Sequence, residues 1–267
     1  MSRPRALPTA ARPRQRSVVT IAKVAGVVVV LFFVGRWIFG PEHLPDFGSI
    51  EDTSEKKAAF FTYLLPHITA VNEEILQQRA TLQAIRDDLA EDDDEPGWLN
   101  RRRLDELCVA YDLEPPETYN LAFVDRLLRR VDIIAPSLVM AQAAIESAWG
   151  TSRFARQGNN LFGMRTYEPG TGIVPKRRPA GATWEVAAYD SVRGAIDNLA
   201  HNLNTNGSYR QMRSIRRDLR RRGAPITGSA LAGGLVRYSE KGHEYISMVR
   251  SMIRVNDLER FDRPAPD

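Results

Sequence analysis

Hydrophobic residues recur every three or four positions along most of the chain, which is the spacing of amphipathic helices. A long helix is predicted over residues 54–90 and ends at the acidic run "EDDDEPG". Gly, Pro and Asn interrupt the other helical segments. These segments are residues 98–113, 118–134, 191–206, 208–223 and one or two helices within 228–258.

The residue pattern changes over 153–191, where Gly, Pro and Asn separate short runs of β-forming residues. We expect Leu161–Thr166 and Thr183–Tyr189 to form the strands of a small sheet or hairpin. The predicted fold class is therefore mainly α, of the α+β kind, with a small β-hairpin lobe.

The most continuous apolar segment is Val18–Phe39, which is 22 residues long and follows an arginine-rich tail. At about 1.5 Å per residue such a helix spans roughly 30 Å, the thickness of the hydrocarbon core of a bilayer. Lys23 and Arg36 lie near its ends, and acidic residues follow it. This charge asymmetry predicts a single-pass anchor in the cytoplasmic (inner) membrane with the rest of the chain on the periplasmic or outer side. A cleaved signal peptide is the alternative, although "RWIFGPEH" lacks a small-x-small cleavage site.

These patterns divide the chain into six parts. They are a basic cytoplasmic tail (1–17), the transmembrane signal anchor (18–39), a linker (40–53), a helical N-terminal region that acts as scaffold or spacer (54–134), a C-terminal domain (135–260) and a tail (261–267).

Composition excludes several classes of site. Cys108 is the single cysteine, so no intrachain disulfide can form, and no His/Cys cluster predicts a metal or another cofactor. The formal net charge is +4, and one basic block is "RSIRRDLRRRG", Arg213–Gly223. No nucleic-acid recognition motif accompanies that block. We interpret it as a solvated helix face rather than a site for anionic glycan or lipid.

The segment "LVMAQAAIESAWG", Leu138–Gly150, raises the main chemical question. Its only charged residue is Glu146, in a helix expected to be capped by Gly150. Gln142, Glu146 and Trp149 would share one face of that helix. Desolvation would keep the carboxyl of Glu146 protonated, as a general acid requires. The alternative for Glu146 is an ion pair with an arginine across the core. Trp149 would either stack on a sugar ring or belong to the core.

The residues that follow are "GTSRFARQGNNLFGM", whose amide side chains suit the hydroxyl and acetamido groups of sugars. Together, "AQAAIESAWGTSRFARQGNNLFGM" resembles the signature of the bacterial glucosaminidase-domain family, glycoside hydrolase family seventy-three. The resemblance extends from about Ala135 to Asn256, and the membrane-distal part as a whole is most similar to the Bax-type branch. It implies a lysozyme-like fold and cleavage of the glycan of peptidoglycan.

The resemblance also implies roles for individual residues. Glu146 would be the general acid, and Tyr238 in "VRYSEKGHEYI" would be a catalytic tyrosine on the wall of the cleft near it. The predicted substrate-binding residues are Trp149, Asn159, Asn160, Phe162 with Gly163, and Tyr189. Tyr189 and Ser191 match the element that opens the following helix. Core packing with the hydroxyl tied to a backbone carbonyl is the alternative for Tyr238, and packing or turn formation is the alternative for Tyr189 and Asn159.

A second carboxylate does not stand out. Many family members place one in the hairpin, where this chain has "GIVPKRRPAGATW". Glu185 and Glu168 are the candidates. The place of the second catalytic carboxylate could instead be taken by water held by Tyr238, by a distant carboxylate or by the 2-acetamido group of the substrate.

The leading hypothesis is a membrane-anchored endo-β-N-acetylglucosaminidase that needs no cofactor. Its partners would be peptidoglycan glycan strands and the cytoplasmic membrane, with no nucleic acid, and the sequence indicates no oligomeric state. Two alternatives stay open: a muramidase or lytic transglycosylase, and an inactive peptidoglycan-binding scaffold.

Overall fold

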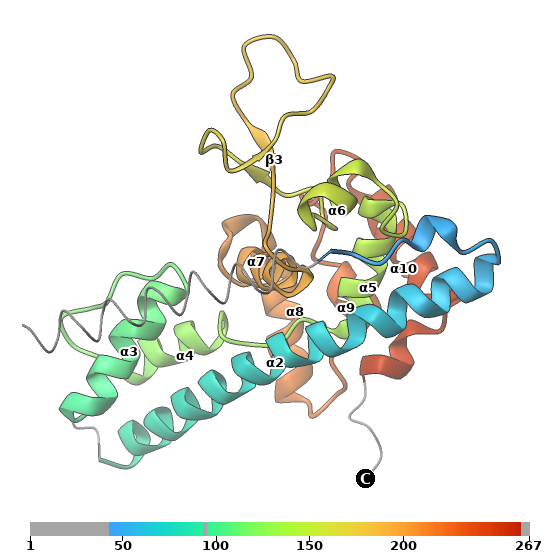
Figure 1. Cartoon of the computed structure of the whole chain (residues 1–267). Coiled ribbons are helices and arrows are strands. Elements are labelled where there is room, and N and C mark those ends of the chain that lie inside the picture. Colours follow the sequence, from blue (N-terminus) through green and yellow to red (C-terminus); the bar gives the residue numbers. More distant parts are fainter. Residues whose placement is uncertain (1–42, 93–94, 263–267) are drawn as a thin grey trace, which may run out of the picture. The chain divides into compact units, whose positions relative to one another are not determined.

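A computed structural model describes residues 43–92 and 95–262 (Figure 1). The predicted basic tail at 1–17 and the predicted anchor at 18–39 lie outside these residues. Within the described ranges, no helix is long and apolar enough to cross a membrane.

The described chain is mainly helical with one small sheet, as the sequence predicts. The helices are α2 (Thr53–Asp92), α3 (Trp98–Ala110), α4 (Leu121–Leu128), α5 (Pro136–Ser147), α6 (Arg153–Gly158), α7 (Val192–Thr205), α8 (Arg210–Arg221), α9 (Gly228–Ala232) and α10 (His243–Val255). Short 3-10 helices are η1 (Phe47–Ser49), η2 (Gly207–Tyr209) and η3 (Leu258–Asp262), and the strands are β1 (Arg165–Thr166), β2 (Gly172–Ile173) and β3 (Glu185–Ala187).

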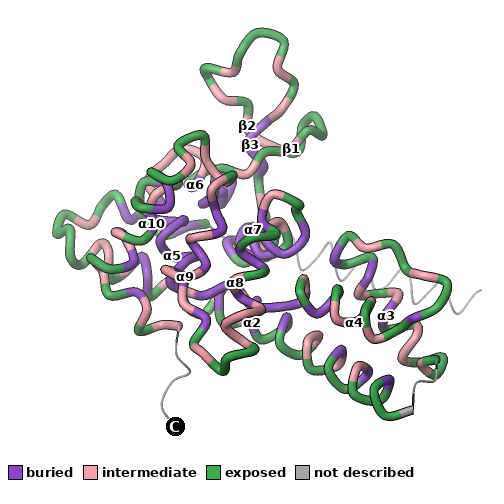
Figure 2. The backbone as a smooth tube through the Cα atoms, turned by 180° about the vertical axis from the view of Figure 1, so that it is seen from behind, coloured by how far each residue is buried: buried purple, intermediate pink, exposed green. Residues whose placement is uncertain are grey.

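Helix α5 lies at the centre of the body and is surrounded by α2, α9, α10 and η3. All its residues from Ser137 to Ala144 are buried (Figure 2). Pro136 occupies the first turn, where a missing N–H costs nothing. The buried apolar residues form one core that runs from Leu44 to Leu258.

The predicted end of this helix at Gly150 is wrong. Helix α5 ends at Ser147, and Ala148, Trp149 and Gly150 all have positive φ, of 51°, 63° and 75°. A Cβ on Gly150 would lie 2.8 Å from a ring carbon of Phe47, so both the backbone conformation and the close packing require glycine there. The chain therefore leaves α5 through a tight left-handed turn.

Helix α2 is 40 residues long, about 60 Å at the usual rise, and carries the N-terminal region. It packs against α4, α5 and α7 and supplies core residues along its length. Residues 43–267 cluster as one compact unit, and the whole described core lies within it.

The sheet is antiparallel with the strand order β1-β3-β2, and Val186 of β3 lies opposite both Arg165 and Ile173. The predicted strands at 161–166 and 183–189 are therefore too long. Residues 161–164 form a turn instead, because the side-chain oxygen of Asn160 accepts hydrogen bonds from the amides of Phe162 and Met164, each at 3.2 Å.

The interpretation of Arg213–Arg222 as a solvated face holds for Arg221 and Arg222, which are exposed, but is wrong for the first turns of α8. Arg213 and Arg216 of α8 are buried, and Arg216 is 1% exposed. The guanidinium of Arg216 donates to the main-chain oxygens of Arg129, Asp132 and Ile133. Its role is to attach α8 to the segment that leads into α5.

The loop after α9 approaches α8 so closely that it leaves no room for a side chain at Gly234. A Cβ there would lie 2.2 Å from the amide nitrogen and 2.3 Å from the Cα of Met212. We expect Gly234→Ala to lower the free energy of unfolding by at least about 2 kcal/mol, because backbone atoms yield little. Urea denaturation measures this. Gly97→Ala is the control, since nothing lies within 4 Å of its Cβ position. Equal effects of the two substitutions would contradict the packing.

Candidate active site

Glu146 occupies the last turn of α5, at the point where this helix leaves the core. The side chain of Gln142, one turn earlier, is fully buried and donates to the hydroxyl of Tyr245 at 3.2 Å. Tyr245 belongs to α10, and its hydroxyl makes a side-chain hydrogen bond to Glu146. Two helices thus hold the carboxyl through a Gln–Tyr–Glu chain of hydrogen bonds.

The surroundings of Glu146 favour its protonated form. Burial of the carboxyl group raises its pKa, and the hydrogen bond from Tyr245 is the smaller, opposing influence. No ion pair between Glu146 and a basic side chain occurs within the described ranges, so the alternative of an arginine partner does not hold there. The predicted direction of the shift is confirmed. Glu146 as a residue is nevertheless exposed, so it has a side open to a ligand.

The turn after Asn160 forms the surface next to the carboxyl. Gly163 is exposed, has a φ of 66°, and would place a Cβ 3.9 Å from Oε2 of Glu146. Asn160 shapes this turn, since its amide group also donates to the carbonyls of Met164 (2.9 Å) and Ala187 (2.8 Å). The predicted contact between the Asn160 amide and a sugar does not fit this geometry, because the side chain is buried and its hydrogen bonds are made with backbone groups.

Tyr238 supports the same turn from the other side. Its hydroxyl donates to the carbonyl of Phe162 at 3.2 Å, and its ring stacks on Tyr245 with centroids 5.2 Å apart and planes at 13°. Phe162 itself is buried in the core. Tyr238 therefore packs in the structure with its hydroxyl on a backbone carbonyl, which was the alternative to a role in the cleft wall. The tyrosine that forms a hydrogen bond with Glu146 is Tyr245.

Trp149 does not share a face with Glu146, because the helix ends at Ser147 and the following left-handed turn redirects the indole. Its ring packs edge-on against Phe60 and Phe61 of α2, with centroids 5.8 and 5.4 Å apart. Lys57 lies over the same ring at 5.3 Å. The indole thus packs between α2 and the end of α5, and its contact with substrate stays a prediction.

Asn159 and Tyr189 join α6 to α7. Asn159 has the left-handed conformation after α6 and donates to the carbonyl of Tyr189 at 3.0 Å. The hydroxyl of Tyr189 donates to Asn198 at 2.9 Å, and burial raises its pKa to about 12. Ser191 caps α7 by accepting from the amide of Gly194, as its match to the helix-opening element predicts. For Asn159 and Tyr189 these contacts match the alternative of turn formation and packing, rather than substrate binding.

The two candidate second carboxylates have different surroundings. Glu185 is buried in β3, and its two oxygens accept from the amides of Gly170 (3.2 Å) and Gly172 (2.9 Å). It therefore ties the first turn of the hairpin lobe to β3. Glu168 lies exposed in that turn. The structure brings neither carboxyl into a recorded contact with Glu146.

Tyr245 is the site residue that sequence reasoning missed. It lies seven residues after Tyr238 in the same quoted segment, "VRYSEKGHEYI", but no local pattern distinguishes which tyrosine faces the carboxyl. The available signal was helical spacing. Tyr245, Val249 and Ile253 recur every four residues, so they fall on the one face of α10 that is buried. Within the described ranges, no group of three or more His, Cys, Asp or Glu could hold a metal ion.

Comparison with known proteins agrees with a carbohydrate-cleaving site. The glucosaminidase family, described as mannosyl-glycoprotein endo-beta-N-acetylglucosaminidase, matches residues 122–258. The chain belongs to this family. It is thus a glycoside hydrolase, and the family resemblance of its sequence is confirmed.

The chain also has a relative that matches over most of both chains. Protein bax of Escherichia coli (strain K12) is 32% identical over 218 residues, which cover 80% of this chain and 74% of that protein. The solved catalytic domain of the autolysin Auto from Listeria monocytogenes aligns with 94% of this chain and 99% of its own. The TM-score of that alignment is 0.42 at 16% identity.

If Glu146 serves as the general acid, the hydrogen bond from Tyr245 should set the upper end of the pH range of this enzyme. Because the bond stabilises the ionised carboxylate, Tyr245→Phe should raise the pKa of Glu146 further. A general acid works while protonated, so the alkaline limb of the pH–rate profile should move to higher pH. Tyr238→Phe is the control, since its hydroxyl bonds a backbone carbonyl instead. An alkaline limb that stays in place in Tyr245→Phe would remove this role.

Proposed function

We propose that the protein is an endo-β-N-acetylglucosaminidase that cleaves the glycan strand of peptidoglycan, with Glu146 as its general acid. The observation that carries this proposal is the carboxyl of Glu146, whose pKa is raised by burial although one side of the residue is exposed. Family membership supplies the class of bond.

Glu146 would donate its proton to the glycosidic oxygen as the bond to the anomeric carbon breaks. The carboxylate that remains accepts the hydrogen bond of Tyr245, and this bond strengthens as negative charge develops. Gln142 fixes the hydroxyl of Tyr245 from behind. The chain of three side chains therefore stabilises the transition state more than the protonated ground state.

Of the two carboxylates in the hairpin lobe, Glu168 is the one that no backbone amide holds. We assign Glu185 to the support of the turn, and Glu168 to the positioning of the attacking water. If Glu168→Gln keeps full activity, the 2-acetamido group of the substrate becomes the better nucleophile.

The test of the central proposal uses residues 43–267, the compact unit that holds the described core. Purified peptidoglycan is incubated with the native protein and with Glu146→Gln, and new reducing ends are identified by mass spectrometry. We expect N-acetylglucosamine ends from the native protein and a loss of at least about a hundredfold in rate for Glu146→Gln, the scale of general acid catalysis.

Other products would change the assignment. N-acetylmuramic acid ends or anhydro ends would make the enzyme a muramidase or a lytic transglycosylase. Retained binding to peptidoglycan without release of any ends would make it a binding scaffold.

The location is a proposal of its own, which rests on the apolar segment at 18–39. We propose an uncleaved anchor in the cytoplasmic membrane with the enzyme on its outer side. The full-length chain should sediment with that membrane at its full mass. A shorter protein recovered free of membrane would show that the segment is a cleaved signal peptide.

A further inference from the structure

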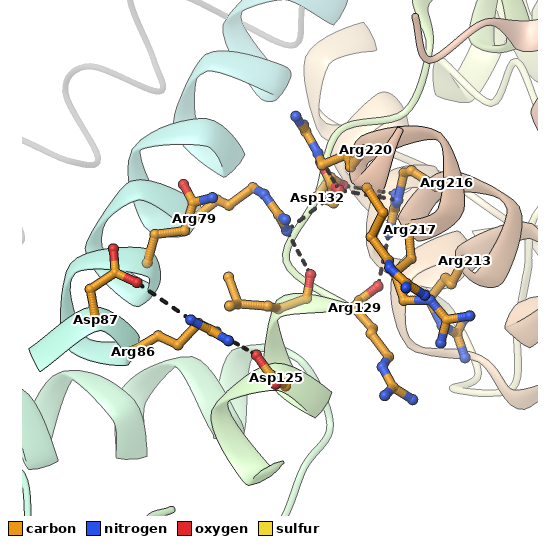
Figure 3. Close-up of a pocket in the computed structure, with 13 residues that line it drawn as sticks. Arg79, Arg86, Asp87, Asp125, Arg129, Asp132, Arg213, Arg216, Arg217 and Arg220 are labelled. Carbon is orange, nitrogen blue, oxygen red and sulfur yellow. Dashed lines mark hydrogen bonds and ion pairs between the residues drawn. The ribbon is translucent and has the colours of Figure 1, made fainter. Parts of the chain in front are cut away.

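A cavity of about 750 Å³ lies between α2, α4 and α8, and its lining is dominated by arginine (Figure 3). Eight arginines and three aspartates line it, so the lining carries a large excess of positive charge. Arg79 and Arg86 belong to α2, Arg129 follows α4, and the other five belong to α8. None of the residues of the candidate active site lines this cavity.

Part of this charge is neutralised within the protein. The buried carboxylate of Asp132 accepts from Arg220 at 2.5 and 2.7 Å, and it lies 3.4 Å from Arg79 and 3.7 Å from Arg216. Asp125 pairs with Arg86 at 2.7 Å. One carboxylate thus serves three guanidinium groups, and the lining stays electropositive.

Other donors around the cavity are left for a ligand. The Nε atom of Arg79 is buried without a hydrogen-bond partner among the described residues. Arg129 and Arg221 are exposed at the cavity, and neither guanidinium has a recorded partner in residues 43–92 or 95–262. Buried N–H groups in native proteins are nearly always satisfied, so an unpaired one in a charged cavity indicates an external acceptor.

The crowding of cations also has an electrostatic cost. Burial and neighbouring arginines lower the pKa of Arg213 to about 10, and burial is the main cause of the similar value for Arg216. A bound anion would offset this repulsion and desolvation.

We propose that this cavity binds a phosphate-bearing ligand with more than one negative charge, at a site separate from Glu146. Guanidinium groups approach from α2, from the end of α4 and from α8, and a tetrahedral phosphate offers oxygens in several directions at once. A single carboxylate is planar, carries one charge and would leave most of the excess unbalanced. The source of the phosphate is either a small soluble molecule or the headgroup of an anionic lipid.

Calorimetric titration of residues 43–267 with inorganic pyrophosphate tests the site, and a short-chain phosphatidic acid below its micellar concentration, whose phosphomonoester can carry two negative charges, tests the lipid source. The variant Arg129→Gln/Arg221→Gln removes two exposed guanidinium groups at the cavity. The matched control is Arg102→Gln/Arg103→Gln on α3, which changes net charge equally at exposed positions outside the cavity. Equal thermal midpoints of the two variants establish that both are folded.

We expect one pyrophosphate per chain, with affinity at least about tenfold weaker in Arg129→Gln/Arg221→Gln and unchanged in the control. Phosphatidic acid that competes with pyrophosphate identifies a lipid headgroup as the source, and pyrophosphate binding without competition identifies a soluble phosphate. Citrate that binds as tightly as pyrophosphate, equal weakening by both variants, or no binding by the native chain would overturn the proposal. Glycan cleavage by Glu146 is measured separately, so the two proposals fail independently.

Discussion

The burial of α5 is the constraint on which the rest of the structure depends. Helices α2, α9 and α10 and the short η3 surround it, and its residues from Ser137 to Ala144 are closed off from solvent. Such a helix can carry an ionisable group only where its neighbours leave a gap. Glu146 occupies that gap, in the last turn before the chain changes to left-handed backbone. The position of the carboxyl follows from the packing of the helix that bears it.

Two opposing influences then set the chemistry of this carboxyl. Desolvation favours the neutral acid, while the hydroxyl of Tyr245 favours the carboxylate. Desolvation is the larger of the two, so the pKa of the carboxyl is raised, and the carboxyl finds a hydrogen-bond donor once its proton has gone. Asn160 and Tyr238 act one step further out, because they hold the turn that brings Gly163 to within reach of Glu146.

Sequence reasoning succeeded where a single local pattern decides the outcome. The hydrophobic spacing of α2 predicts that helix almost to the residue, and an uncompensated charge in an apolar helix identifies Glu146. It failed where tertiary contacts decide. The indole of Trp149 is turned toward α2 by a left-handed exit that helical spacing cannot anticipate. Arg216 looked solvated because its acceptors are carbonyl groups more than 80 residues away along the chain.

The central claim is that burial raises the pKa of Glu146. Carbon-13 NMR titration of the glutamate carboxyls in residues 43–267 measures this directly, and the signal lost in Glu146→Gln assigns the group. The account predicts that the carboxyl of Glu146 titrates at a higher pH than those of the exposed glutamates. Titration of Glu146 together with the exposed glutamates would contradict it.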